Sequence, residues 1–201
     1  MHLEVLVEES SAEAVVRRVV AAATPATATY EVRVFDGKTD LLGSLPDRLR
    51  GYRSWAIDGL RIMVLVDRDT EDCLQLKSRL EALAHGAGFT TRTSANSGSF
   101  EVCNRIAVEE LEAWFLGDEP ALRAAFPRLK PFAAKAQYRD PDKIVGAWET
   151  AERLLQRASY YQAGLRKRDL SLRVAPLMNI GENRSASFAT FVSGLTSLMA
   201  E

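Results

Sequence analysis

The sequence of 201 residues holds few of the side chains that bind soft metals or act as nucleophiles. Its two histidines, His2 and His85, have no partner at a ligand spacing, which argues against a zinc site. No arrangement typical of a Ser-His-Asp triad is present either. The two cysteines, Cys73 and Cys103, have no metal spacing around them and are interpreted as buried free thiols.

Long apolar runs are also absent, and none approaches the length of a membrane span. The N-terminal stretch "MHLEVLVEE" meets an acid at Glu4 and lacks the apolar core of a signal peptide. We therefore expect a cytoplasmic protein with no membrane partner. The phosphate-binding pattern GxxxxGK[ST] is missing as well, so any nucleotide hydrolysis is expected from a partner protein.

The net charge of −1 conceals an uneven distribution. Residues 1–120 hold 13 Lys+Arg against 20 Asp+Glu, whereas residues 121–201 hold 13 against 7. An acidic half followed by a basic half suits a cation site that acts on a polyanion, with the run "LRKR" at 165–168 as a candidate binding surface. Ordinary solvated surface charge is the alternative interpretation.

Strand-like segments alternate with helical ones through the first half of the chain. The hydrophobic content of 47% is enough for one domain or for a domain with a subdomain. One expected helix has Ser10 and Glu13 spaced as a capping box, and another has Thr70 as its cap. The β-type runs stand at 3–7, 30–35, 62–66, 89–93 and 100–107. This alternation predicts an α/β fold with a mostly parallel, Rossmann-like sheet flanked by helices.

Beyond the last predicted strand the pattern becomes helical. The stretch "DPDKIVGAWETAERLLQRA" is predicted as one helix, capped by Asp140 and with Pro141 in its first turn. "EELEAWFLG" and "SASFATFVSGLTSLMA" are predicted as further helices. We therefore predict an α/β core over residues 1–120 and a helical extension over residues 121–201 that packs on it.

Acidic residues follow two of the predicted strands, at the point where each strand ends. Glu8 and Glu9 follow the first strand, and Asp67 and Asp69 follow the strand at 62–66. Ligands of open parallel sheets bind beyond the carboxyl ends of the strands. If these two strands are neighbours, Glu8 joins the Asp-x-Asp pair. Oxygen ligands without His or Cys select Mg²⁺ or Mn²⁺, which serve phosphate chemistry.

A second acidic group, Glu109, Glu110 and Glu112, stands at the next predicted strand-to-helix junction. Glu109 and Glu112 are three residues apart and are predicted to share a helix face, while Glu110 points elsewhere. Glu109 and Glu112 are therefore candidate ligands of a second metal ion. The alternative is an acid-rich first turn that suits the helix dipole.

Two basic residues are candidates for binding a substrate phosphate. Lys38 in "FDGKTDLL" follows the strand at 30–35 and a glycine, so a turn would aim its ammonium group at an anion. Arg184 in "GENRSASF" precedes the last predicted helix. For this second segment, the alternative is a structural one in which Ser185 is the N-cap of that helix.

A Glu after the first strand and an Asp-x-Asp after a later strand resemble the Toprim fold, which occurs in topoisomerases, primases and overcoming-lysogenization-defect (OLD) nucleases. Here "LVEESSAE" supplies Glu8, with Glu9 where the family has Gly, and "LVDRD" supplies Asp67 and Asp69. The resemblance implies a Toprim-like fold and a Mg²⁺- or Mn²⁺-dependent nuclease. Asp67 and Asp69 would be metal ligands and catalytic residues, and Glu8 a metal ligand or general base. No tyrosine stands at a strand-passage position, so topoisomerase activity is not expected.

Over its whole length the chain resembles a bacterial Toprim-like domain family of unknown function. The stretches that carry this likeness are "DGKTDLL", "VLVDRDTEDC", "RIAVEELEAWFLGD", "YRDPDKI" and "NRSASF". Members of this group resemble partners of AAA- or ABC-type ATPases in phage-defence operons. The resemblance therefore implies an effector nuclease that acts on DNA or RNA, tRNA included, with an ATPase encoded nearby as its partner.

Two other functions remain open on the sequence alone. A phospho-receiver-like signalling domain also has an acid pair after its first strand and an Asp after its third, here Glu8, Glu9 and Asp67, with Thr93 or Ser94 as its switch hydroxyl. It requires a Lys after the last strand, and "NRIAVEEL" has none. A catalytically idle Toprim-fold interaction module is the other possibility, although the three key carboxylates are intact.

Overall fold

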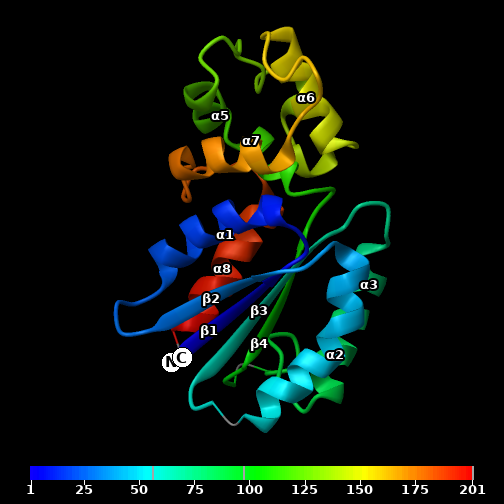
Figure 1. Ribbon diagram of the computed structural model, residues 1–201, viewed down its shortest axis with the longest axis vertical. Coiled ribbons are helices and arrows are strands. Elements are labelled where there is room, and N and C mark those ends of the chain that lie inside the picture. The colour runs from blue at the N-terminus through cyan, green and yellow to red at the C-terminus, as the bar shows by residue number, and fades with distance from the viewer. Residues whose placement is uncertain (56, 97, 201) are drawn as a thin grey trace.

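The computed structural model describes residues 1–55, 57–96 and 98–200 and is shown in Figure 1. Glu201, the last residue of the predicted extension, lies outside the described residues. The strands are β1 (His2–Val7), β2 (Thr29–Val34), β3 (Leu60–Asp67) and β4 (Val102–Ala107). The helices are α1 (Ser10–Ala23), α2 (Lys38–Ser54), α3 (Cys73–Gly86), α4 (Glu112–Gly117), α5 (Glu119–Ala125), α6 (Ala147–Arg157), α7 (Lys167–Val174) and α8 (Ala186–Met199). Short 3₁₀ helices are η1 (Ala136–Tyr138), η2 (Pro141–Lys143) and η3 (Ala175–Leu177).

The described strands form one parallel sheet in the order β2-β1-β3-β4. Val5 of β1 lies opposite Val32 of β2 and Met63 of β3, and Asp67 of β3 lies opposite Ala107 of β4. The central strands β1 and β3 are buried on both faces, which explains their nearly continuous apolar runs. The predicted fold class, a mostly parallel α/β sheet flanked by helices, is confirmed.

Helices cover both faces of the sheet. α1 and α8 lie on one face, and α2 and α3 lie on the other (Figure 1). Because side chains alternate along a strand, Val5 and Leu65 pack with the first pair of helices, whereas Leu6 and Val64 pack with the second pair. Strands β1, β3 and β4 therefore contribute to two hydrophobic cores, whereas the buried Val32 of β2 belongs to the first.

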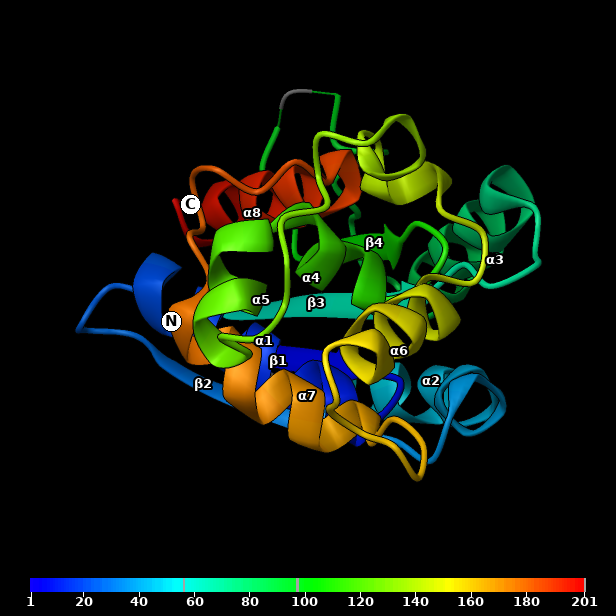
Figure 2. The ribbon, with the colours of Figure 1, turned by 90° about the horizontal axis from the view of Figure 1, so that it is seen from above.

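Helices α5, α6 and α7, which we call the cap, lie beyond the carboxyl ends of the strands (Figures 1 and 2). In the cap, α7 packs against α1, and after the cap the chain returns to the sheet as α8, which packs on β4 and α1. One hydrophobic cluster runs from Val5 in the sheet through Phe115 to Phe126 and Leu155 in the cap. Apolar packing therefore holds the cap over this edge of the sheet, while the division at residue 120 stays a prediction.

A strand predicted at 89–93 is wrong. Only Thr91 pairs with the sheet, through an isolated bridge to Val102 at the start of β4. The chain turns directly afterwards, because the backbone N–H groups of Ser94 and Ala95 both donate to the carbonyl oxygen of Thr91. The Ser94 hydroxyl also donates to the Thr91 carbonyl at 3.1 Å, and hydroxyl-to-backbone bonds of this kind favour a turn over a sheet ladder.

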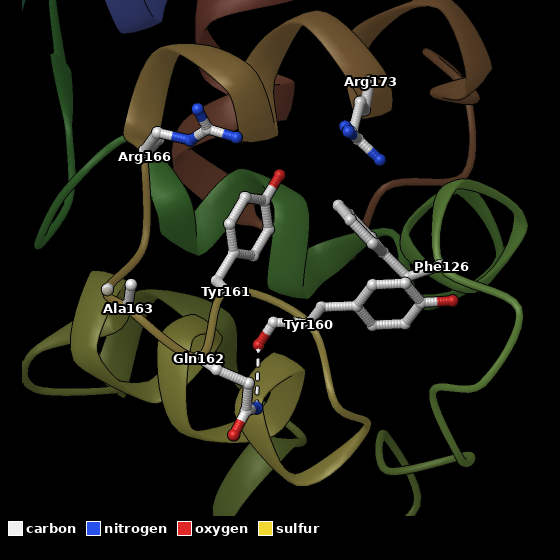
Figure 3. Close-up of a pocket in the computed structure, with 8 residues that line it drawn as sticks. Phe126, Tyr160, Tyr161, Gln162, Ala163, Arg166 and Arg173 are labelled. Atoms are coloured by element: carbon white, nitrogen blue, oxygen red, sulfur yellow. Dashed lines mark hydrogen bonds between the residues drawn. The ribbon is translucent and has the colours of Figure 1, made fainter.

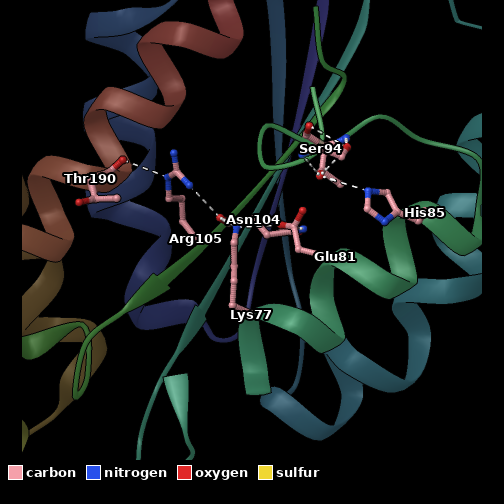
Figure 4. A network of polar contacts seen from close by, with 8 residues as sticks. Lys77, Glu81, His85, Ser94, Asn104, Arg105 and Thr190 are labelled. Carbon is pink, nitrogen blue, oxygen red and sulfur yellow. Dashed lines mark hydrogen bonds and ion pairs between the residues drawn. The ribbon is translucent and has the colours of Figure 1, made fainter. Parts of the chain in front are cut away.

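The strand β4 is tied to helices on both sides by a polar network (Figure 4). The Asn104 amide donates to Glu81 of α3 at 2.8 Å, and the Lys77 ammonium donates to the Asn104 carbonyl at 2.8 Å. On the other side, Arg105 Nε donates to the Thr190 carbonyl of α8 at 3.0 Å. Because Asn104 and Glu81 are both buried, these bonds fix the position of β4 at the edge of the sheet.

Two predicted helix starts differ in the structure. α1 has Glu9 as its N-cap and no side-chain capping bond, so the capping box of Ser10 and Glu13 does not form. α3 is capped by Asp72, which accepts from the Gln75 N–H at 2.8 Å, and not by Thr70. The left-handed backbone at Asp69, with φ of 50°, extends the turn after β3, so the helix begins later than the hydroxyl of Thr70 indicates.

The single helix predicted from Asp140 is divided into η2 and α6. Gly146 separates them with φ of 64°, a conformation that a glycine adopts without the steric cost of a Cβ atom. The alternative interpretation of Ser185 is confirmed, since its hydroxyl caps α8 by accepting from the Phe188 N–H at 3.0 Å.

The structure also describes two features that the sequence analysis considered, namely membrane-spanning helices and the two cysteines. Within the described ranges, no helix is both long enough and apolar enough to cross a membrane. Both cysteines are free; Cys103 is buried, as predicted, whereas Cys73 is only half-buried, because it stands at the exposed start of α3.

Trp114 connects α4 to α8 and should dominate the stability of this junction. It is fully buried, its indole N–H donates to Ser187 Oγ at 2.8 Å, and its ring lies 5.1 Å from Phe188 and 5.3 Å from Phe191. We expect Trp114→Ala to lower the free energy of unfolding by about 3–5 kcal/mol in urea titrations. Trp55→Ala is the control, because 66% of that side chain is exposed, and it should cost less than about 1 kcal/mol. Equal losses would contradict this assignment.

Candidate functional site

The carboxylates after β1 and β3 meet at one point of the sheet edge. The two strands are neighbours, which is the condition under which Glu8 was expected to join the Asp-x-Asp pair, with Val7 opposite Leu65. The Asp67 N–H donates to Glu8 Oε2 at 3.1 Å, which places the Glu8 side chain at the end of β3. Parallel pairing forces these ends together, because all strands of the sheet finish at the same edge.

The turn that follows β3 is joined to the turn that follows β4. The Arg68 N–H donates to the Ala107 carbonyl at 2.8 Å, and the Asp69 N–H donates to the Glu109 carbonyl at 2.8 Å. Asp69 and Glu109 both have positive φ, of 50° and 64°. Non-glycine residues adopt this conformation at a cost, so these interlocked turns hold the acidic residues in a specific arrangement.

We call Glu8, Asp67, Asp69 and Glu112 the carboxylate cluster. Asp67 and Glu112 are its buried members. Burial, together with the charges of Glu112 and Glu8, raises the pKa of Asp67 well above its ordinary value. Burial also raises the pKa of Glu112 to about 7, against the opposing influence of Lys167. Neither carboxylate oxygen of Glu112 has a hydrogen-bond partner within the described residues. Glu112 is thus an unsatisfied acid beside a second buried acid, an arrangement typical of functional sites.

Glu8 is half-buried beside this pair. Burial raises its pKa, although the Asp67 N–H and the charge of Lys38 act in the opposite direction. A carboxylate with a raised pKa is a stronger base than a free one. Glu8 therefore has the properties of a proton acceptor at neutral pH.

Lys38, predicted as a phosphate ligand, lies in the cluster. Its ammonium group is 2.6 Å from Asp69 Oδ2 and 3.0 Å from Glu71 Oε1. Lys38 stands at the start of α2, directly after Gly37 with φ of 90°, and this turn aims the side chain across the edge of the sheet. The prediction that a turn would direct Lys38 toward an anion agrees with this geometry, and the anions it meets here are carboxylates.

Lys167 of the cap approaches the cluster from the opposite side. Its ammonium group lies 3.8 Å from Glu112 Oε2 and 3.8 Å from Glu9 Oε1. Burial lowers the pKa of Lys167, but the charges of Glu112, Glu9 and Glu110 outweigh it and leave the pKa raised. Lys167 of the "LRKR" run therefore faces the buried Glu112 and the half-exposed Glu9, while 31% of its own side chain stays exposed.

The second acidic group is arranged differently from the prediction. Glu109 precedes α4 and does not share a helix face with Glu112, because α4 begins only at Glu112. The Glu109 carboxylate forms an ion pair with Arg68. Glu110 instead faces the cap, where its Oε2 accepts from the Trp148 N–H at 2.9 Å. Burial raises the pKa of Glu110, and its electrostatic neighbours include Lys167 and Asp69.

Arg184, the second predicted phosphate ligand, is engaged in holding the chain together. Its guanidinium group donates to the backbone carbonyls of Tyr138, Arg139 and Leu116. No ion pair joins Arg184 to an acidic residue in the part of the chain that the structure describes. These bonds give Arg184 a structural role between α4 and η1, and its predicted contact with a phosphate stays a prediction.

The donor set suits a hard divalent cation in kind. It is made of carboxylate oxygens, and Glu112 contributes two that lack a partner. Across residues 1–55, 57–96 and 98–200, however, no three acidic, histidine or cysteine side chains converge closely enough to hold one metal ion. Lys38 and Lys167 supply positive charge to these acids instead. Coordination would therefore require Asp69 to rotate away from Lys38.

Sequence reasoning did not single out Lys167 as a site residue, and it placed Glu109 and Glu112 on one helix face, which the structure does not. The only signal for Lys167 was its place in a basic run, which does not say which of its residues turns toward the acids.

Comparisons with known proteins agree with this fold. A family model described as a domain of unknown function (DUF4276) matches residues 7–196. Among solved structures, the C-terminal region of the Xanthomonas campestris pv. campestris OLD protein is similar, with a TM-score of 0.50 and 16% sequence identity over 98% of this chain and 95% of that chain. This likeness shows a shared fold, consistent with a Toprim-like, Rossmann-type sheet. A search of curated proteins finds no match.

Glu112 should give the folded protein a pH-dependent stability. Its pKa of about 7 exceeds the ordinary value of 4.5, so between these values the folded state binds more protons than the unfolded chain. The free energy of unfolding should therefore fall as the pH rises from about 5 to about 8, by up to about 3 kcal/mol from this group. Glu112→Gln removes this titration, and urea titrations across that range should show a flatter profile.

Two comparisons help to assign the pH dependence to Glu112. Asp67, whose pKa is raised in the same direction, should leave part of the slope in Glu112→Gln. Glu31→Gln removes a carboxylate from an exposed position and should keep the wild-type profile. If Glu112→Gln also keeps the wild-type profile, the titration belongs to another group.

Proposed function

We propose that this chain, which belongs to the DUF4276 family, is a divalent-metal-dependent nuclease of Toprim type. The observation that carries the proposal is the meeting of Glu8, Asp67 and Glu112 at the carboxyl edge of a parallel sheet. Buried carboxylates that repel one another destabilise a fold, and Glu112 also lacks a hydrogen-bond partner within the described residues, so a structure that keeps them indicates a functional demand. Neutralisation by a divalent cation meets that demand.

Glu8, Asp67 and Asp69 are the residues that would hold Mg²⁺ or Mn²⁺, with Glu112 as a further oxygen ligand. A bound divalent ion would neutralise charge on a phosphoryl oxygen and assist the attack of water on phosphorus. Glu109 is a weaker candidate than the sequence indicated, because Arg68 already neutralises its carboxylate.

Glu8 is proposed to accept the proton of the attacking water. Its raised pKa brings it closer to neutral pH than an exposed glutamate, and its hydrogen bond from Asp67 fixes its orientation. A role as a metal ligand remains compatible with the same position. Both roles require the negative charge of Glu8.

Lys38 and Lys167 are proposed to contact the phosphodiester backbone of the substrate. Each ammonium group is held at the edge of the carboxylate cluster by the acids around it. If those acids held a divalent cation, its charge would neutralise them, and both lysines would be free to bind phosphate oxygens. Substrate binding and metal binding are therefore expected to support each other.

The signalling alternative has less support from the geometry. Ser94, its candidate switch hydroxyl together with Thr93, bonds to Thr91. Thr91 pairs with Val102 at the start of β4, whereas Asp67 lies beside Ala107 at the end of β4. The switch residue and the phosphate acceptor of such a domain would thus stand at opposite edges of the sheet. An idle interaction module stays the main alternative, and a cleavage assay separates it from a nuclease.

The wider setting is also proposed. The substrate would be DNA or RNA, tRNA included, and an AAA- or ABC-type ATPase encoded nearby would control a cytoplasmic effector in phage defence. These proposals rest on the resemblance to the Toprim-like group. An assay with and without such an ATPase tests them.

Metal binding should depend on the Asp-x-Asp pair. The double variant Asp67→Asn with Asp69→Asn should lose Mn²⁺ binding in isothermal titration calorimetry. Its fold should be kept or stabilised without metal, because the repulsion among buried carboxylates is relieved. Asp47→Asn, which changes an acid that is 82% exposed, should bind Mn²⁺ like the wild type. Undiminished binding by the double variant would show that the site is elsewhere.

Cleavage should depend on Glu8. Glu8→Gln keeps size and hydrogen-bonding capacity but removes charge and basicity, so it should reduce Mn²⁺-dependent cleavage by at least about a hundredfold. Binding of nucleic acid should stay near that of the wild type. Glu31→Gln serves as the exposed control, and labelled DNA and RNA substrates should be compared in gel assays. A wild-type chain with no divalent-dependent cleavage would favour the idle module.

A further inference from the structure

The cap contains a cavity of about 530 Å³ that the proposed chemistry does not use. Aromatic side chains from Phe126, Tyr160 and Tyr161 and the guanidinium groups of Arg166 and Arg173 line it. Figure 3 shows the arginines projecting from the start and the far end of α7, facing the tyrosines of the loop that follows α6. Cavities of a few hundred Å³ with aromatic walls and a few charged groups are typical ligand sites.

The aromatic walls are held in place by the loop backbone and by one another. The Phe126 ring lies 5.0 Å from Tyr160 and 5.7 Å from Tyr161, both at steep angles. Ser159 and Tyr161 have positive φ, of 62° and 48°. A bulky aromatic residue adopts this conformation at a cost, and the hydrogen bond from the Tyr161 hydroxyl to Asp169 at 2.6 Å helps to maintain it.

The two arginines of the cavity differ in their pairing. Arg173 Nε lies 3.0 Å from Asp169 Oδ2, so its charge is partly neutralised. Arg166 is exposed and forms no ion pair with any residue that the structure describes. A free guanidinium group at the rim of an aromatic cavity favours an anionic ligand that also offers a flat ring.

A second cavity of about 250 Å³ adjoins the first and is strongly basic. Arg128, Lys130, Lys135 and Arg157 line it, without an acidic residue among its lining side chains. Arg128 joins the two cavities, because its guanidinium group also lies 4.2 Å from the centre of the Tyr160 ring. We call the two cavities together the cap groove, with aromatic walls in the first cavity and basic side chains in the second.

The cap groove is connected to the carboxylate cluster through one peptide bond. Arg166 lines the groove, and the next residue, Lys167, has its ammonium group 3.8 Å from Glu112 Oε2. A polyanion that occupies the groove therefore reaches the start of α7, next to Lys167 of the proposed active site.

We propose that the cap groove binds a single-stranded segment of nucleic acid. Unpaired bases would stack on the half-buried rings of Tyr160 and Tyr161 that line the first cavity, and the phosphates would lie along Arg166 and the basic second cavity. An acidic peptide shares the charge but has no flat rings for the aromatic walls. The inference deepens the proposed nuclease function by naming the strand form of its substrate, and it rests on that function.

The test measures binding without cleavage. Fluorescence anisotropy of a short fluorescein-labelled single-stranded oligonucleotide, in DNA and RNA form, is followed in EDTA with the full chain. Tyr160→Leu should weaken binding at least about fivefold, while Tyr160→Phe should stay within about twofold of the wild type, because it keeps the ring. Arg166→Gln should reduce the slope of log affinity against log salt by about one. Arg79→Gln, an exposed arginine on α3, should leave both affinity and slope unchanged.

Each outcome decides the proposal separately from catalysis. Wild-type affinity in Tyr160→Leu with an unchanged salt slope in Arg166→Gln would overturn it. Equal affinity for a duplex of the same sequence, or for polyglutamate, would also overturn it. Melting temperatures of the variants near that of the wild type exclude unfolding as the cause of weaker binding. Variant-sensitive binding by a chain that cleaves nothing with Mn²⁺ would support the groove and overturn the proposed nuclease.

Discussion

Electrostatic repulsion among buried and half-buried carboxylates is the constraint on which the rest of this structure depends. Asp67 and Glu112 are buried and Glu8 is half-buried, so burial raises the pKa of all three, and the charges of Glu112 and Glu8 raise the pKa of Asp67 further. Parallel pairing of β1 and β3 leaves no freedom to separate Glu8 from Asp67. The topology therefore brings these carboxylates together at a cost in electrostatic energy. Positive charges from the surrounding elements offset this cost.

The need for positive charge beside these acids explains why the cap is fixed next to the sheet. Lys38 supplies one positive charge from α2, and Lys167 supplies another from α7, although a hundred or more residues separate α7 from β3 in the chain. α7 can hold Lys167 there only if the cap is fixed relative to the sheet. Apolar packing of α7 on α1 and the buried Trp114 between α4 and α8 fix it. A change of cap position would thus alter the charge balance of the cluster.

The sequence was informative where local pattern and topology act together. Apolar runs placed the sheet strands, and acids at the ends of two runs placed Glu8 and Asp67 at one edge, because parallel strands leave no other arrangement. The sequence was uninformative about features of the site that depend on one backbone angle or on one long-range contact. Glu109, with its positive φ, lies before α4 and does not share a helix face with Glu112, and no local pattern encodes the approach of Lys167 to Glu112.

The internal lysines give the proposed reaction an order. While Lys38 and Lys167 pair with the acids, their ammonium groups are occupied and do not bind a phosphodiester. If Glu8, Asp67 and Asp69 held a divalent cation, its charge would neutralise the acids, and the two lysines would be free to contact phosphate. Metal and polyanion should consequently bind with positive coupling, and by linkage each strengthens the other by the same factor. The same fold without metal would hold a strand in the cap groove but present it to a repelling edge.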